Sequence, residues 1–262
     1  MKLATIRTPT GTAAVRVEDD HAVELGEPDL GALLRHEDWL DRATVDGPTH
    51  AVSDLDFAPV VPSPEKILCV GLNYRRHILE MGRELPKFPT LFAKFPPALI
   101  GAYDDIVLPE VSDAMDWEAE LALVTGPGGT IAGYTVLNDV TARDWQYRTA
   151  QWLQGKTFAR TTPVGPYLVT GDLAPAQLSC EVNGELMQSA STSDLVFGPA
   201  ELIEYISTIL PLAPGDLIAT GTPGGVGHAR KPPVRLGDGD LVTTRIEGLG
   251  ECHNRCRAEK PS

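Results

Sequence analysis

Short, mainly apolar, strand-like runs alternate with turn residues in the first part of the chain. Three such runs lie at residues 3–6, 13–17 and 22–25. The residues that separate them are turn formers: Pro9, Gly11, Asp19 and Asp20. Side chains that alternate between two faces over this length are typical of half-buried strands, and the residues between favour tight turns. The pattern predicts a small β-meander over the first 27 residues.

After these runs, the apolar residues follow the spacing of a helix. Asp29 is a suitable helix N-cap, because its carboxylate can accept a hydrogen bond from a free backbone amide of the first turn. Apolar residues follow at helical spacing: Leu30, Leu33, Leu34 and Leu40. This stripe predicts one short amphipathic helix.

Three prolines mark the best candidate for a domain boundary. Pro59, Pro62 and Pro64 lie just before the apolar run at residues 66–70, and such prolines are typical of connecting segments. The sequence therefore predicts a small N-terminal domain over residues 1–60 and a larger domain over residues 61–262.

Strands dominate the larger domain. Runs that favour strands lie at residues 66–70, 117–124, 133–138, 167–170 and 216–220. The pair Asn183-Gly184, between two further runs at residues 179–182 and 185–188, predicts a β-hairpin. Helices are expected from Tyr74 to Met81 and from Glu201 to Leu210. The fold class is therefore mainly β, of the α+β type.

The charge of the chain restricts its partners. Its 36 acidic and 22 basic residues give a net charge of −14, which repels nucleic acid and anionic lipid. Four cysteines are too few for a disulfide framework in 262 residues, so reduced thiols are expected. No stretch approaches the ~20 apolar residues of a membrane span, and the N-terminus resembles no signal peptide. We expect a cytoplasmic protein that binds neither nucleic acid nor membrane.

Two carboxylates project from one face of a predicted strand. Glu118 and Glu120 are two residues apart in the run at 117–124, so their side chains lie side by side. Like charges at this spacing repel unless a cation lies between them, and a hard divalent ion prefers oxygen ligands. Asp139, directly after the run at 133–138, is positioned to complete the set. The alternative is a solvated acidic edge.

Other polar residues are spaced to work in pairs. His77 and Glu80 are three positions apart on the predicted helix of an irregular segment, residues 71–97, that looks like a mobile cover. A carboxylate beside an imidazole makes a general base, although the spacing alone favours a surface ion pair. Arg143 and Gln146 are also three apart and offer a guanidinium and an amide from one turn, unless they form a solvated face.

The glycine-rich loop at residues 221–227 does not support a nucleotide site. It lacks both the Lys-Ser/Thr ending of a phosphate-binding loop and the GxGxxG spacing. Glycines after a strand do allow backbone amides to approach an anion, so a small carboxylate is a possible ligand. Cys252, His253 and Cys256 lack a second ligand pair for zinc and are interpreted as structural.

Eight segments in order carry a resemblance to a known family. They are KILCVGLNYRRHILEMG, LFAKFP, DWEAELALVTG, GYTVLNDVTARDWQ, QWLQGKTF, TPVGPYLV, GDLIATGTPGGVG and ECHNRCRAE. Together they resemble the fumarylacetoacetate hydrolase family, and the resemblance extends roughly over residues 58–258. The resemblance implies a mixed-sheet β-sandwich roll, a homodimer, and one Mg²⁺ or Mn²⁺ per subunit.

The resemblance also implies roles for individual residues. The metal ligands fall on Glu118, Glu120 and Asp139, the catalytic groups on His77, Glu80 and Lys156, and the substrate-binding groups on Arg143, Gln146 and Thr222. Larger family members supply a fourth carboxylate near residues 71–73, which this chain lacks. The segment Phe158-Ala159-Arg160-Thr161-Thr162 also departs from the pattern of many smaller members, so the pocket wall there is expected to differ.

The implied chemistry is that of 2-oxo acids. Hydrolysis of an acylpyruvate, fumarylpyruvate for example, is the first expectation, with His77 and Glu80 deprotonating the attacking water. Decarboxylation of oxaloacetate, or isomerisation and decarboxylation of a 2-hydroxy-dienedioate, uses the same enolate and is the alternative. A non-catalytic metal-dependent binding protein would not need His77 and Glu80. We further expect one cation to meet a second carboxylate of the substrate. Arg160 is the first candidate, and the cations of the cover, Arg75, Arg76, Arg83 and Lys87, are the alternatives.

Overall fold

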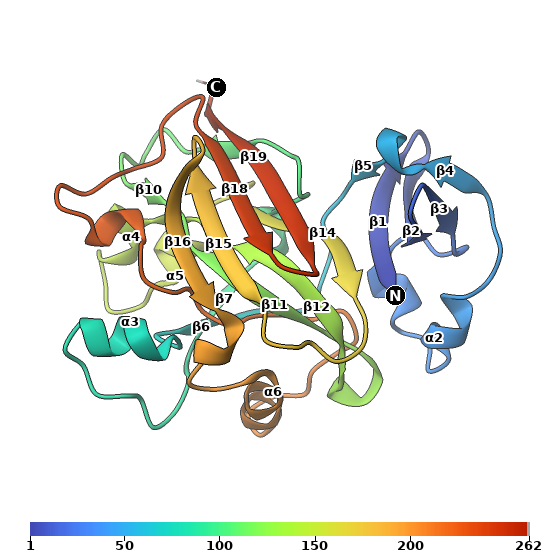
Figure 1. Ribbon diagram of the computed structural model, residues 1–262, viewed down its shortest axis with the longest axis horizontal. Helices are drawn as coiled ribbons and strands as arrows, with labels where there is room; N and C mark the ends of the chain where they lie inside the picture. Colours follow the sequence, from blue (N-terminus) through green and yellow to red (C-terminus); the bar gives the residue numbers. More distant parts are fainter. Residues whose placement is uncertain (261–262) are drawn as a thin grey trace.

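The computed structural model describes residues 1–260, in which a small N-terminal unit lies beside a larger body of two packed sheets (Figure 1). The N-terminal unit contains the strands β1 (Lys2–Thr8), β2 (Gly11–Val17), β3 (His21–Glu24) and β4 (Thr49–Ala51). Each strand is antiparallel to the next. The predicted meander is therefore confirmed, with β4 as an added fourth strand.

The N-terminal unit is joined to the larger body through β1. β5 (Asp56–Phe57) pairs with β1, and β1 also pairs with β14 (Thr162–Val169). The unit buries its own apolar cluster, which includes Ile6, Val15 and Phe57. One sheet therefore continues from the N-terminal strands into the larger body.

The larger part of that sheet carries the candidate site. After β14 its strands are, in spatial order, β12 (Ile131–Asn138), β11 (Ala119–Thr125), β17 (Leu217–Ala219), β6 (Ile67–Gly71) and β7 (Thr90–Lys94). Neighbours are antiparallel except β17 and β6, which are parallel. The short β8 (Leu99–Ile100) adds a parallel pairing to β14. The sheet is mixed, as expected.

A second sheet covers one face of the first. Its strands are, in spatial order, β16 (Glu185–Ser191), β15 (Gln177–Val182), β18 (Leu241–Ile246), β19 (Gly250–Ala258) and β9 (Ile106–Leu108). The hairpin between β15 and β16 turns at Asn183 and Gly184, which have φ angles of 53° and 79°. This left-handed pair confirms the predicted hairpin. A separate two-stranded ribbon pairs β10 (Met115–Asp116) with β13 (Thr141–Ala142).

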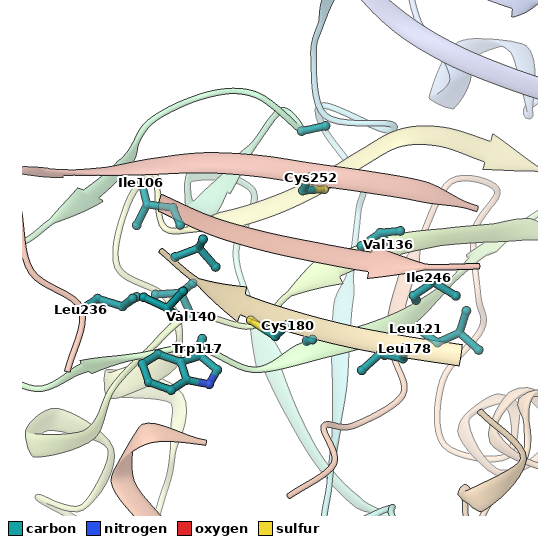
Figure 2. Packing of buried hydrophobic residues seen from close by; sticks show 14 of the residues in the cluster. Ile106, Trp117, Leu121, Val136, Val140, Leu178, Cys180, Leu236, Ile246 and Cys252 are labelled. Atoms are coloured by element: carbon teal, nitrogen blue, oxygen red, sulfur yellow. The ribbon is translucent and has the colours of Figure 1, made fainter. Parts of the chain in front are cut away.

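The main core lies between the two sheets (Figure 2). Leu121 and Val136 from β11 and β12 pack in one cluster with Leu178, Ile246 and Cys252 from the second sheet. Because alternate side chains of each strand enter this layer, the other face of β11 and the strand ends are available for polar groups. The sandwich architecture and the mainly β fold class are confirmed.

Helices are short and lie around the sheets. They are α1 (Leu30–Leu33), α2 (Trp39–Arg42), α3 (Arg75–Glu80), α4 (Arg143–Gln146), α5 (Leu153–Lys156) and α6 (Pro199–Ser207). Single 3₁₀ turns are η1 (Val52–Asp54), η2 (Pro96–Ala98), η3 (Pro127–Gly129), η4 (Thr192–Asp194) and η5 (Gly227–Ala229). The predicted helix over residues 74–81 is confirmed as α3, flanked by its two cap residues.

Two predicted helices differ from those observed. The single N-terminal helix is two separate one-turn helices, so Trp39 is buried while Leu40 is 52% exposed. Asp29 does cap the first, accepting a 2.8 Å hydrogen bond from the amide of Ala32. α6 begins earlier than predicted, because Pro199 suits the first helical turn. It also ends earlier, at Ser207, so Ile209 and Leu210 of the predicted apolar stripe lie beyond the helix.

Burial also settles the state of the cysteines. All four are buried and unpaired, which confirms the expected free thiols. Within residues 1–260, no helix has the length and apolar character needed to cross a membrane.

Candidate active site and metal centre

Three carboxylates meet where β11 begins and β12 ends. The strand pairing opens at Ala119↔Asn138, so Glu118 and Asp139 flank the first pair, and the amide of Asp139 donates to the carbonyl of Glu118 at 2.8 Å. Glu120 follows on β11. All three side chains are buried, and their ligand oxygens lie within 4.8 Å of one another. The structure thus brings together the three residues that the sequence proposed as metal ligands.

Two buried lysines bind the same carboxylates. Lys156, at the end of α5, donates to Oε2 of Glu118 and to Oδ2 of Asp139, both at 2.8 Å. Lys94, at the end of β7, donates to Oδ1 of Asp139 at 2.7 Å. Burial opposes the charged form of Lys156, but Asp139 and Glu118 outweigh it and raise its pKa. Lys156 is therefore a permanent cation, and its ammonium keeps a third N–H group for another acceptor.

Glu120 is the carboxylate without a cationic partner. Its Oε2 accepts a 2.7 Å hydrogen bond from the amide of Gly221, and no lysine or arginine among residues 1–260 pairs with it. Burial, then the charges of Asp139 and Glu118, raise its pKa well above the usual range. A divalent cation would supply the missing positive charge, and the all-oxygen donor set fits Mg²⁺ or Mn²⁺.

A buried arginine forms the next layer. Arg143, the first residue of α4, donates from Nε to Oδ2 of Asp116 at 2.8 Å and lies 2.6 Å from Oε1 of Glu118 through Nη1. The same Nη1 donates to Oε1 of Gln146 at 2.9 Å, one turn further along the helix. Glu118 is thereby held between Arg143 and Lys156, which fixes the orientation of its carboxylate.

The glycine-rich loop is attached to β11 by a buried amide. Gln188 accepts from the amide of Ala119 at 2.9 Å and donates to Oγ1 of Thr222 at 2.8 Å, while Thr222 donates to the carbonyl of Ala119. Gly221 has a φ of +102°, and a Cβ there would lie 2.9 Å from the carbonyl oxygen of Val70. The close approach of this loop therefore requires glycine.

His77 and Glu80 lie next to one another beside this loop. A Cβ on Gly224 would lie 3.2 Å from Nδ1 of His77 and 3.5 Å from Oε2 of Glu80. No ion pair joins the two side chains in the described part of the chain. Burial lowers the pKa of His77, and the nearby charge of Glu80 only partly offsets this. The imidazole is consequently neutral at pH 7 and able to accept a proton.

Part of this network lines a cavity of about 210 Å³, whereas Glu120, Asp139 and Lys94 do not reach its wall. Its walls include the sequence-proposed residues His77, Glu118, Arg143, Gln146, Lys156 and Thr222. Its other polar residues are Arg83, Tyr147 and His228. Glu80 lines an adjoining cavity of about 660 Å³ instead, which also includes His77.

Arg160 is not brought to this cavity. It is exposed, has a φ of 57°, and its backbone bonds to Pro97 and Val107. The left-handed backbone at Arg160 turns the chain into β14, away from the residues that line the site. The rim cation that the structure does place on the cavity is Arg83, one of the cations of the cover.

Sequence reasoning missed three residues that organise the site: Lys94, Asp116 and Gln188. Lys94 and Asp116 lie within segments that carried the family resemblance, but neither residue was given a role in the site. The signal that was available is a charged residue inside an apolar strand pattern, which must find a partner if it is buried. Such a residue does not reveal which distant carboxylate or amide it meets.

Comparison with known proteins places this arrangement in a family. Residues 66–257 match the model of the C-terminal domain of fumarylacetoacetate (FAA) hydrolase. The chain is 47% identical over 219 residues to the mitochondrial oxaloacetate tautomerase FAHD2B of Bos taurus, which covers 78% of this chain and 70% of that protein.

Two solved structures share the whole fold. One is a fumarylacetoacetate hydrolase from Exiguobacterium antarcticum, at 32% identity with a TM-score of 0.88 over 99% of this chain and 100% of that one. The other is maleylpyruvate hydrolase from Sphingobium sp. SYK-6 with manganese(II) and pyruvate, at 27% identity with a TM-score of 0.80 over the same shares. The chain therefore belongs to the fumarylacetoacetate hydrolase family.

Proposed function

We propose that this protein is a metal-dependent enzyme that interconverts the keto and enol forms of a short 2-oxo dicarboxylic acid, with oxaloacetate as the first candidate. The observation that carries the proposal is the neutral imidazole of His77, which lines the same small cavity as Lys156 and Arg143. A neutral base beside two fixed cations suits removal of a proton next to a carbonyl group. Relatives named as oxaloacetate tautomerases support this choice.

Glu118, Glu120 and Asp139 would hold one Mg²⁺ or Mn²⁺. When bound, such an ion supplies a Lewis acid that favours the negative charge of an enolate. The chain's own cations share this task, because Lys156 and Arg143 are buried beside the carboxylates and cannot be screened by bulk water.

The side chains divide the work of proton transfer. Arg143, Gln146 and Thr222 bind and orient the 1-carboxylate of the substrate, while the third N–H of Lys156 faces the 2-oxo oxygen. His77 takes a proton from C3. The electron pair of that C–H bond forms the C2–C3 double bond, and the carbonyl pair moves to the 2-oxo oxygen. This oxygen then takes the proton from the imidazolium of His77, which gives the enol and restores the neutral base. The reverse sequence returns the keto form.

Hydrolysis of an acylpyruvate is the second candidate. It is favoured by the position of Glu80, whose carboxylate lies beside His77 at Gly224 and faces a larger adjoining cavity. In that reaction His77, with Glu80, would deprotonate a water that attacks the 4-carbonyl. The similarity to the maleylpyruvate hydrolase of Sphingobium sp. SYK-6 supports this second candidate. Decarboxylation of oxaloacetate and isomerisation of a dienedioate are variants of the same enolate chemistry.

Two assays on the purified protein with Mg²⁺ separate these candidates. The first follows the ultraviolet absorbance of enol-oxaloacetate as it converts to the keto form, and the second identifies by mass the products of an acylpyruvate panel. The proposal predicts EDTA-sensitive loss of the enol signal without bond cleavage. Cleavage of acylpyruvates with no acceleration of enol loss would overturn it in favour of hydrolysis. The homodimer and the cytoplasmic location stay predictions.

A further inference from the structure

The cavity has a buried end and an exposed rim. Glu118, Arg143 and Lys156 are buried at one end, whereas Tyr147 is 57% exposed and His228 is also exposed at the other. A 2-oxo acid whose 1-carboxylate is bound by Arg143 therefore directs its far end toward the rim. The side chains at the rim therefore decide which 2-oxo acid the site prefers.

The backbone of His228 is fixed relative to Arg143. Asp116 accepts at Oδ2 both from Nε of Arg143, at 2.8 Å, and from the amide of His228, at 2.9 Å. Its Oδ1 accepts from the amide of Gly227 at 2.7 Å. One buried carboxylate thus sets the distance between the group that binds the near end of the substrate and the residue at its far end.

The ring of His228 is also supported. It packs against Tyr147, with ring centroids 5.2 Å apart and planes inclined by 37°. Because Tyr147 directly follows α4, which starts at Arg143, both sides of this pair are tied to the same short helix. The two rings therefore form one wall of the mouth rather than two independent surface side chains.

The charges around His228 are mainly positive. Partial burial, then Arg143 and Arg235, lower the pKa of this ring, and Asp116 raises it only in part. Across the cavity, Arg83 and His77 of the cover complete the rim. The imidazole is therefore neutral at pH 7 and keeps an N–H donor, in surroundings that favour an anion.

We propose that His228, supported by Tyr147, recognises a second carboxylate at the far end of the substrate and so sets the preference for dicarboxylic over monocarboxylic 2-oxo acids. This inference rests on the proposed function for the identity of the near end. It replaces Arg160, which lies outside the cavity, with a residue that the fold positions at the mouth.

The test compares two substrates that differ only at the far end. Oxaloacetate carries a carboxylate where 2-oxobutanoate carries a methyl group, and exchange of the C3 protons for deuterium reports on both. In the parent protein kcat/KM should favour oxaloacetate. His228→Ala should reduce this ratio by roughly tenfold, the size of one charge-assisted hydrogen bond. The same rate loss on both substrates, or an unchanged ratio, would overturn the proposal.

The pH dependence of the ratio gives a second readout. Because the pKa of His228 is lowered, the ring becomes protonated mainly as pH falls from about 7 to about 5, and the preference for oxaloacetate should increase over that range in the parent. His228→Gln keeps an N–H donor but cannot be charged, so it should retain part of the preference and lose its pH dependence. Titration of His77 affects both substrates alike and cancels in the ratio.

Binding separates this proposal from the proposed function. Calorimetry on the Mg²⁺-loaded protein compares malate with 2-hydroxybutanoate, a pair with the same far-end difference that needs no catalysis. If C3 exchange is absent but the parent prefers malate and His228→Ala does not, the proposed function fails and this inference stands. If the parent shows no preference for malate, the inference fails whatever the activity. His36→Gln, in the N-terminal unit, is the matched control and should change neither ratio.

Discussion

At the scale of single residues, the site is defined by an imbalance of buried charge. Four carboxylates, of Asp116, Glu118, Glu120 and Asp139, are buried with three cations, of Lys94, Arg143 and Lys156. Every carboxylate except Glu120 has a cationic partner within 2.8 Å. A buried unpaired charge costs several kcal/mol, so the protein gains by neutralising Glu120, through a proton or through a metal.

Replacement of Glu120 by Gln tests this account of the metal centre. The change keeps the shape of the side chain and removes the unpaired charge, so the metal content of the purified protein should fall well below one ion per chain. The melting temperature of the EDTA-treated protein should not fall, because no cationic partner is lost. Elemental analysis and thermal unfolding measure the two effects.

Glu185→Gln is the matched control, since Glu185 is an exposed carboxylate on β16. It should alter neither metal content nor melting temperature. Full, EDTA-sensitive metal binding by Glu120→Gln would show that Glu120 is not a ligand.

At the scale of elements, local signals in the sequence were enough for some parts and not for others. α3 and the hairpin at Asn183 depend on neighbours in the chain, and both were predicted. The polar network of the site depends on long-range pairs, since Lys94 and Asp139 are 45 positions apart and Ala119 and Gln188 are 69 apart. No local pattern encodes such partners, and the placement of Arg160 failed to follow from sequence for the same reason.

The predicted cover is only partly irregular. β7 belongs to the large sheet, which leaves α3 and the loop after it outside that sheet. α3 is anchored to the body, because Ile78 is buried and the amide of Arg76 donates to Asp194. In the loop after it, Phe88 stacks on Tyr205 with ring centroids 6.3 Å apart. Phe88 itself is 67% exposed. A loop with so few buried side chains, here residues 81–89, opens at low free energy.

Hydrogen exchange tests whether this segment closes over ligand. Oxalate with Mg²⁺ mimics the chelating end of a 2-oxo acid, and its binding should slow amide exchange across residues 72–89, because His77 must approach the bound ligand. Amides of the hairpin strands β15 and β16 serve as the internal control and should not change. Slow exchange that is the same with and without ligand would mean that α3 forms a rigid wall.

At the scale of the whole molecule, a chain of net charge −14 concentrates its buried cations around one cavity. Lys94, Arg143 and Lys156 reach that cavity region from three separate segments, β7, α4 and α5, which the mixed sheet brings to one end of β11 and β12. The net charge of the molecule repels anions at long range, whereas the buried cations favour an anion locally at this cavity.

The central claim is that this site moves a proton at C3 of a 2-oxo acid with His77 as the base. The most direct measurement is the rate at which the C3 protons of oxaloacetate exchange for deuterium, followed by proton NMR in D₂O with saturating Mg²⁺. The parent protein should accelerate exchange, and His77→Gln should lower the rate by about 10²–10⁴-fold, the usual contribution of a general base, while retaining its metal. Exchange at the parent rate in His77→Gln, with its metal content intact, would contradict the account.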